Sequence, residues 1–290
     1  MQLYLTTEVC LLADVFENFR ATCHEAYELD LSYFVSAPQL AWNAMFKKTK
    51  LKVKLLSNPE MYLMIQPNIR GCICHASVRY ANANNKYMGA LYDATKEDSY
   101  ILYIDANNQY GWAMSQALPK DNYAWLSEAE VREAETALTS DNRKKRVGFF
   151  DMVARARREL ARAVNAELNG VLYDPPIKDI NFSMQYILEV DLEYPREIHD
   201  RDDDYPLAPE LVEIKTEMLS AKHLQLRRKY YGATTPYSRK LVCSLLPKKK
   251  YVLHSKNLKF YVDRKMKVTK VHRGIKFSTG DYLKELSSCF

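Results

Sequence analysis

An apolar run that ends in one isolated carboxylate is the feature that most limits how this chain folds. Residues 100–104 read YILYI, and Asp105 follows them directly. β-Branched and aromatic residues in such a run are typical of a strand, so we expect a strand over 99–105 with Asp105 at its end. Tyr110 comes five residues later. A plain transition from strand to loop requires neither Asp105 nor Tyr110.

Helical periodicity dominates the remaining N-terminal part. Apolar residues recur every three or four positions over 3–29, which predicts an amphipathic helix. Pro38 suits the first turn of a second helix, which we expect over 39–49. The short apolar run 61–65 predicts a strand, and residues 66–81 predict a turn followed by an extended segment.

The C-terminal half alternates charged helices with strands. Residues 127–169 are highly charged and have helical spacing, whereas 184–195 indicate a strand that Pro195 ends. Basic and aromatic residues alternate over 248–262 and again over 268–277. This alternation suits a nucleic-acid backbone with stacking bases. It equally suits the solvent-exposed face of ordinary strands, so both interpretations stay open.

Composition favours a globular protein of the cell interior. The 290 residues are 47% hydrophobic, and the formal net charge of +6 is a mild lean toward polyanions such as nucleic acid. The six cysteines include no C-x-x-C pair, so neither a zinc ribbon nor a disulfide framework is indicated. The N-terminus lacks the features of a signal peptide, and no apolar run reaches about 18 residues. We therefore expect an intracellular location, nuclear in a eukaryotic host, with neither secretion nor membrane association.

A carboxylate at a strand end also permits metal chemistry. Mg²⁺ prefers oxygen ligands, and two such ions about 4 Å apart activate phosphoryl transfer. Asp191, within the apolar strand 184–195, is a candidate for the second carboxylate beside Asp105, which would make a two-metal nuclease. The alternative is that each aspartate is an ordinary turn or cap residue.

Residues 105–114, DANNQYGWAM, resemble motif A of family B DNA polymerases, whose pattern is D-x-x-S-L-Y-P. The chain is similar in particular to the protein-primed branch, as found in Maverick/Polinton-type mobile elements. Residues 4–19 resemble the third exonuclease motif, and 69–72 resemble the Y-x-G-G turn between exonuclease and palm. Residues 186–210 and 248–262 resemble the region that follows motif A.

The resemblance implies roles for the residues of motif A. Asp105 would be the catalytic carboxylate and would ligate both Mg²⁺ ions. Tyr110 would pack under the sugar of the incoming nucleotide and exclude ribonucleotides. The backbone near Ala106, Asn107 and Asn108 would cradle the triphosphate.

The other motifs imply further site residues and partners. Arg70 and Gly71 would contact template or primer DNA, and Lys276 would face the triphosphate or DNA. Tyr4 and Glu8 would be the remnant of the exonuclease motif. The expected cofactor is Mg²⁺, and the expected partners are a DNA template and primer, a dNTP and a terminal priming protein.

The fold implied is α+β. It would combine a partial family B polymerase palm, with helices packed on an antiparallel sheet, with an exonuclease-domain helix and an inserted helical and β region. The corresponding domains would be the end of the exonuclease domain at 1–30 and a linker helix with the first part of the palm at 31–126. A post-motif-A insertion resembling a terminal-protein region would follow at 127–275, and the approach to the fingers at 276–290.

Departures from the family pattern predict a fragment without activity of its own. Glu8 stands where the family has Asp, Cys72 replaces the second glycine of the turn, and Gly111 replaces the proline of motif A. Motifs B and C do not occur in the 290 residues, and motif C supplies the second metal aspartate. Two alternatives stay open: a remnant that binds DNA or a priming protein without catalysis, and a two-metal nuclease that uses Asp105 and Asp191.

Overall fold

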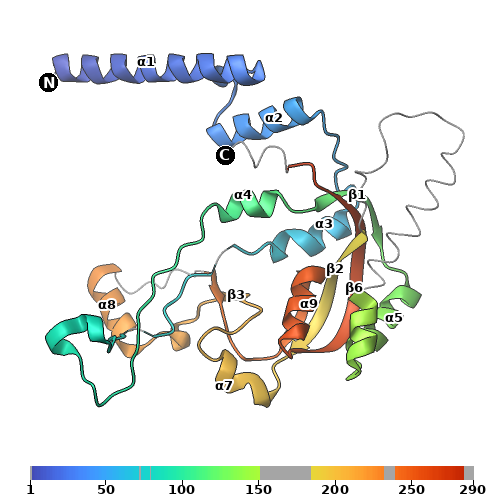
Figure 1. Ribbon diagram of the computed structural model, residues 1–290. Coiled ribbons are helices and arrows are strands. Elements are labelled where there is room, and N and C mark those ends of the chain that lie inside the picture. The colour runs from blue at the N-terminus through green and yellow to red at the C-terminus, as the bar shows by residue number, and fades with distance from the viewer. Residues whose placement is uncertain (1, 72, 79, 151–183, 232–238, 284–290) are drawn as a thin grey trace, which may run out of the picture.

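The computed structural model describes residues 2–71, 73–78, 80–150, 184–231 and 239–283 (Figure 1). These residues form the mixed α+β fold that the sequence predicts. Its centre is an antiparallel sheet that curls into a half-barrel, and a two-stranded sheet lies apart from it. In spatial order the larger sheet comprises β1 (Leu118–Trp125), β6 (Lys267–Gly280), β2 (Met184–Glu193) and β5 (Lys248–His254). The smaller sheet pairs β3 (Glu210–Glu213) with β4 (Arg239–Val242).

Helices cover both faces of the larger sheet, because the side chains of each strand alternate between the two faces. On one face, Leu188 of β2 packs in a core with residues of α5 (Glu128–Leu138) and α9 (Ser255–Asp263). On the other face, Ile275 and Phe277 of β6 pack against α3 (Pro59–Ile65). Each of these two cores therefore joins segments that are far apart in the chain.

The structure confirms the predicted strand over β2 and the predicted helices over α1 (Gln2–Tyr27) and α2 (Ala37–Thr49). The alternating stretch 268–277, whose interpretation the sequence leaves open, lies in strand β6. α5 confirms the first part of the predicted helical region, and residues 151–169 of that region lie outside the described residues. A capping box starts α5: Glu130 N–H donates to Ser127 Oγ, and Ser127 N–H donates to Glu130 Oε2. The remaining elements are α4 (Gln109–Met114), α7 (His199–Asp202), α8 (Ala221–Tyr231) and 3₁₀ turns at Leu31–Tyr33, Gln66–Asn68, Lys86–Leu91, Arg196–Ile198 and Thr216–Met218.

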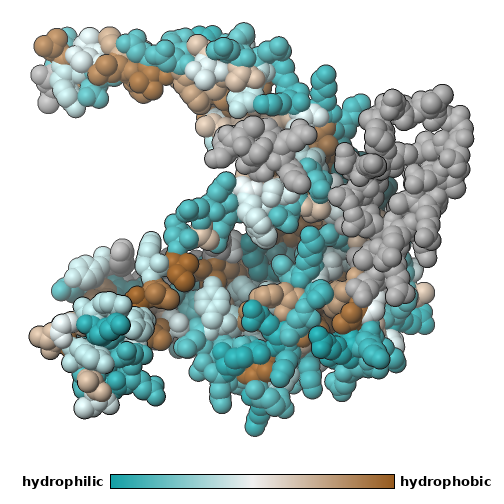
Figure 2. All heavy atoms as spheres, viewed as in Figure 1, coloured by the Kyte–Doolittle hydropathy of each residue, from teal (hydrophilic) through white to brown (hydrophobic). Residues whose placement is uncertain are grey.

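Helix α1 projects away from the rest of the chain (Figure 1). Among its residues only Cys23 is buried, so its apolar side chains are largely exposed, and Figure 2 shows them as brown patches along the helix. No helix within the described ranges is long and apolar enough to cross a membrane.

Two predicted strands are wrong. Residues 61–65 belong to helix α3, because the Asn58 side chain caps the N–H groups of Glu60 and Met61 and Pro59 fits the first turn. The run 100–104 is in no strand of the structure, and its side chains are exposed. One isolated bridge, between Asn84 and Ser99, precedes it. Residues with high β-propensity form a strand only when another strand pairs with them, and none of the described segments pairs with 100–104.

The basic and aromatic stretch 248–262 is a strand only in its first half. β5 ends at His254, whose Nδ1 accepts the N–H of Lys256 and so caps α9. The division into domains stays a prediction. The larger sheet does, however, combine β1 from the predicted palm region with β2 and β5 from the predicted insertion, and β6 crosses the boundary at 275.

Candidate functional site

The segment that carries Asp105 ends in a tight loop before α4. Asn108 adopts a left-handed backbone conformation, with φ of 51°, that Asn tolerates better than most residues. Its Oδ1 accepts the N–H of Gly111 at 3.0 Å, and its carbonyl oxygen accepts the N–H of Trp112 at 3.0 Å. A Cβ at position 111 would collide with the Asn108 side chain. This close contact explains why glycine occupies position 111.

The residues predicted around motif A lie together on this loop and in the first turn of α4, and they are open to solvent. Asp105, Ala106, Asn107 and Tyr110 are all exposed, and the Tyr110 side chain is 78% accessible. Asp105 forms no ion pair with any residue of the described part. Its carboxylate is therefore accessible to a cation or another ligand.

Asp191 is in a different environment. It lies buried on β2, where its carboxylate accepts the backbone N–H of Lys250 at 2.8 Å and contacts His272 Nε2 at 2.8 Å and Lys249 Nζ at 3.1 Å. Burial alone would raise the pKa of Asp191, but the hydrogen bonds from Lys250, His272 and Lys249 outweigh it and lower the pKa to about 2. This carboxylate is engaged in joining three segments of the sheet, which argues against a metal site shared with Asp105.

The exonuclease-motif remnant and the segment around the turn at 69–72 lie on other parts of the chain. Tyr4 and Glu8 are exposed and one turn apart on α1. Cys72 lies outside the described residues, and His75 Nε2 is 3.2 Å from the carbonyl oxygen of Asp204. Within the described ranges, no group of three or more His, Cys, Asp or Glu side chains is arranged to hold a metal ion.

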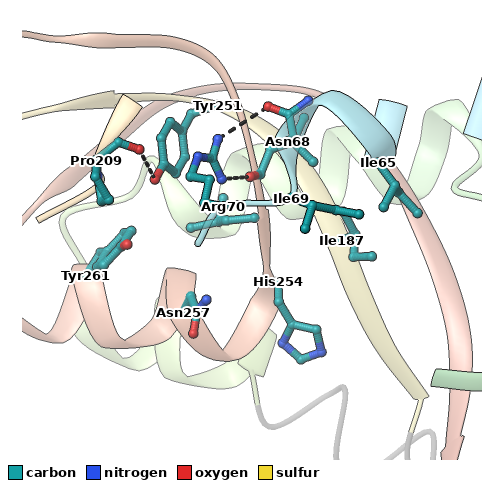
Figure 3. A pocket seen from close by; sticks show the side chains of 12 residues that line it. Ile65, Asn68, Ile69, Arg70, Ile187, Pro209, Tyr251, His254, Asn257 and Tyr261 are labelled. Atoms are coloured by element: carbon teal, nitrogen blue, oxygen red, sulfur yellow. Dashed lines mark hydrogen bonds between the residues drawn. The ribbon is translucent and has the colours of Figure 1, made fainter. Parts of the chain in front are cut away.

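Arg70 is the predicted site residue with the most extensive contacts (Figure 3). Its guanidinium lies 3.9 Å from the centre of the Tyr251 ring. Nη1 donates to the Val252 carbonyl oxygen at 2.8 Å, and Nη2 donates to Asn68 Oδ1 at 3.3 Å. Tyr251 in turn donates its hydroxyl to the Pro209 carbonyl oxygen at 3.0 Å. Arg70 therefore links the turn after α3 to strand β5.

Arg70 lines two adjoining hollows. The first, a cavity of about 280 Å³, lies between the turn after α3, β5 and α9. The second, of about 250 Å³, is a groove whose basic side chains are Arg70, Arg239, Lys249 and Lys250. We call these the cavity and the basic groove. Asn68, Arg70 and Tyr251 line both of them.

The basic groove carries an excess of positive charge. Its one acidic side chain, Glu210, is bound at 2.8 Å to Lys248 Nζ, and Lys249 is paired with Asp191. Arg70, Arg239 and Lys250 have no carboxylate within ion-pair distance in the part of the chain that the structure describes. Sequence reasoning selected Arg70 and the basic stretch containing Lys250 but missed Arg239, which no local pattern connects with them.

Gly71 and Lys276, the other two predicted DNA contacts, are not part of this groove. Gly71 is exposed, and a Cβ at its position would meet nothing within 4 Å, so no tight packing requires glycine there. Lys276 Nζ is 2.8 Å from Glu130 Oε1, and this hydrogen bond is the main cause that lowers the pKa of Glu130. Lys276 thus joins β6 to the first turn of α5.

Comparisons of the chain with protein-family models, with curated proteins and with solved structures give no significant match in any of them.

Proposed function

We propose that the chain is part of a protein-primed family B DNA polymerase and that its described residues bind DNA in the basic groove around Arg70. The observation that carries the proposal is the set of cations Arg70, Arg239 and Lys250. They line one groove and lack carboxylate partners in the described part. A cluster of uncompensated cations is the feature that a phosphate backbone requires.

A groove that has a planar group among its cations suits a single DNA strand better than an open surface with scattered lysines does. Tyr251 is buried, and its ring holds the guanidinium of Arg70, a planar cation, beside Arg239 and Lys250. Proteins that bind single strands combine a basic groove with planar side chains on which bases stack. The DNA would be the template or primer strand that the resemblance implies.

The polymerase part of the proposal rests on the motif A resemblance at 105–114. Asp105 and Tyr110 are exposed, as a metal ligand and a sugar contact must be. Two Mg²⁺ ions would neutralise charge on the transferring phosphate, but they need more carboxylates than Asp105. The described residues do not complete such a site, so we propose no catalytic step for this chain alone. A dNTP and a priming protein would be partners of the whole polymerase.

The binding experiment measures the anisotropy of a fluorescent single-stranded oligonucleotide over a range of salt concentrations. The double variant Arg239→Gln/Lys250→Gln removes two groove cations. We expect it to weaken binding and to reduce the slope of log K against log salt by about 1.4, since each phosphate contact on a single strand contributes about 0.7. The matched control is Lys48→Gln/Lys52→Gln, which removes the same charge from exposed positions elsewhere.

Equal slopes for the groove variant and the control would contradict binding in the groove. The polymerase assignment has its own test, which is to sequence the gene and transcript on both sides of the reading frame. In-frame codons for the motifs N-S-x-Y-G and D-T-D support it, and their absence contradicts it. The expected lack of catalysis would be overturned if the 290-residue chain extends a primer, or cleaves DNA with Mg²⁺, and Asp105→Ala abolishes that activity.

A further inference from the structure

The cavity beside the basic groove has the dimensions and walls of a small binding site. At about 280 Å³ it lies near the lower end of the roughly 300–1,000 Å³ typical of small-molecule sites. Figure 3 shows Arg70 and Asn257 on opposite sides of it, with Tyr261 and Pro209 toward one end and Ile187 toward the other. The space is therefore bounded by planar and apolar groups with a few polar groups between them.

The Asn257 amide is a polar group of the cavity that is available to a ligand. Asn257 is exposed on α9, and its amide makes no hydrogen bond to any residue of the described ranges. An amide offers both a donor and an acceptor. His254 Nδ1 accepts the N–H of Lys256 at 3.1 Å, which leaves the proton of a neutral imidazole on Nε2. Burial lowers the pKa of His254 to about 4, so the ring is neutral at physiological pH.

The cavity adjoins the basic groove. Asn68, Arg70 and Tyr251 line both, so a ligand in the cavity that carries a phosphate can place it among Arg239, Lys250 and the guanidinium of Arg70. Tyr251 and Arg70 are held in position by the Pro209 and Val252 carbonyl oxygens. Their stacked arrangement therefore exists before any ligand binds.

We propose that the cavity receives the base of one unpaired nucleotide of a single DNA strand, while the adjoining phosphates lie in the basic groove. This inference rests on the proposed DNA binding and adds to it a base-holding subsite. The base would lie among the planar groups of Arg70 and Tyr261, and its polar edge would meet the Asn257 amide. Because every base has a flat face, such a site tolerates different bases.

An acidic peptide is the other ligand that the basic groove would attract. It would satisfy the groove cations through its carboxylates, but it has no flat ring for the adjoining cavity. The apolar wall formed by Ile65, Ile69 and Ile187 would then stay without a partner. A strand of nucleotides uses both hollows at once, so the observations favour it.

The test compares two labelled oligonucleotides of about 12 units: oligothymidylate and the same phosphate backbone with abasic sugars throughout. Both carry the same charge, so their difference in affinity measures the contribution of the bases. We expect the wild-type chain to bind oligothymidylate more tightly, by about 5- to 150-fold for one stacked base. Asn257→Leu keeps the size of the side chain but replaces the amide with methyl groups, which leaves the polar edge of a bound base without a partner. It should remove most of this difference without changing the affinity for the abasic strand.

Two further variants serve as controls for the effect of Asn257→Leu. Asn257→Ala removes the amide but leaves the space open, so it should retain part of the base-dependent affinity. Asn43→Leu makes the matched substitution on the exposed side of α2 and should leave both affinities unchanged. Thermal unfolding of each variant shows whether it is folded.

The outcomes separate the two proposals. Equal wild-type affinity for both strands, with the salt dependence intact, overturns the base subsite and leaves the proposed function standing. A preference for bases that persists in Asn257→Leu also overturns the subsite, because the base is then bound elsewhere. No binding of either strand overturns the proposed function itself. Competition by poly-glutamate as effective as that by oligothymidylate overturns both in favour of an acidic peptide.

Discussion

The guanidinium of Arg70 lies over the Tyr251 ring, 3.9 Å from its centre, and donates to the carbonyl oxygen of the next residue, Val252, at 2.8 Å. Arg70 follows the turn at Gln66–Asn68, whereas Tyr251 and Val252 lie in β5. This contact attaches the segment after α3 to the edge of the larger sheet. The same contact shapes both the cavity and the basic groove, so folding and binding depend on one side chain.

Arg70→Ala should therefore destabilise the chain. A hydrogen bond from a charged group contributes about 1.5–3 kcal/mol, and a cation–π contact roughly 0.5–1 kcal/mol at an exposed site. We expect the free energy of unfolding, measured with urea, to fall by about 2–3 kcal/mol. Arg70→Lys keeps the charge but not the planar fork, so it should recover less than half of the loss.

The control is Arg196→Ala, at an exposed position, for which a change above about 0.5 kcal/mol is not expected. Equal stabilities of Arg70→Ala and wild type would show that the contact is not formed in solution.

Local signals account for the elements that the sequence predicts well. α5 starts where Ser127 and Glu130 form a capping box, and β2 follows from an alternating apolar run that Pro195 ends. The prediction at 61–65 failed because the Asn58 cap carries more weight than a short apolar run, which suits either a helix or a strand. At 100–104 composition indicates a strand, but a strand needs a partner, and a partner is not a local property.

The candidate site is less predictable because it is assembled from distant segments. The resemblance of residues 69–72 to a family motif indicates Arg70, whereas Arg239 reaches the groove only because β4 pairs with β3. Lys248 shows the converse case. It belongs to a basic stretch that sequence reasoning associates with nucleic acid, yet its side chain is completely buried. Only the tertiary structure shows which lysines of such a stretch face solvent.

The buried Lys248 predicts an asymmetry between two substitutions. Its Nζ donates to Glu210 Oε2 at 2.8 Å and to Ser244 Oγ at 2.7 Å, which links the larger sheet to the smaller one. Glu210→Ala leaves a buried ammonium without its partner, and breaking buried pairs costs about 3–5 kcal/mol. Water reaches the partly exposed Glu210, so we expect a loss of roughly 2–3 kcal/mol in the free energy of unfolding. Lys248→Met replaces the charge with an apolar chain of similar length and should change stability by less than about 1 kcal/mol. A larger loss for Lys248→Met than for Glu210→Ala in urea unfolding would contradict this account.

The environment of Asp191 predicts how stability depends on pH. Its pKa in the folded chain, about 2, lies below the ordinary value of about 3.9. A carboxyl group with a lowered pKa stabilises the fold above its unfolded pKa, and this contribution is lost as the pH falls through the folded pKa. Urea unfolding at a series of pH values should show a loss of stability between about pH 4 and pH 2 that is smaller in Asp191→Asn. That variant should also be less stable at neutral pH, because Lys249 and His272 lose a charged partner.

The matched control for Asp191 is Glu193→Gln, which removes an exposed carboxylate from the same strand. The loss of stability between pH 4 and pH 2 should be as large in this variant as in wild type. If Asp191→Asn and Glu193→Gln flatten the pH dependence equally, the three hydrogen bonds to Asp191 are not its cause.

The exposed run 100–104 predicts that the chain associates with itself. Its five side chains are between 54% and 95% accessible, and none of them is charged. Short segments with high β-propensity, low charge and no proline are the ones that pair with a strand of another molecule. The brown atoms beside the segment that leads to α4 in Figure 2 show this apolar surface.

We expect light scattering from the purified chain to rise with concentration. The double variant Ile101→Lys/Ile104→Lys should reduce it, because like charges oppose strand pairing and the side chains make no core contact that the variant would lose. Leu3→Lys/Val9→Lys places the same charges on the exposed apolar residues of α1. If this control reduces the scattering and the first variant does not, association occurs through α1 and not through residues 100–104.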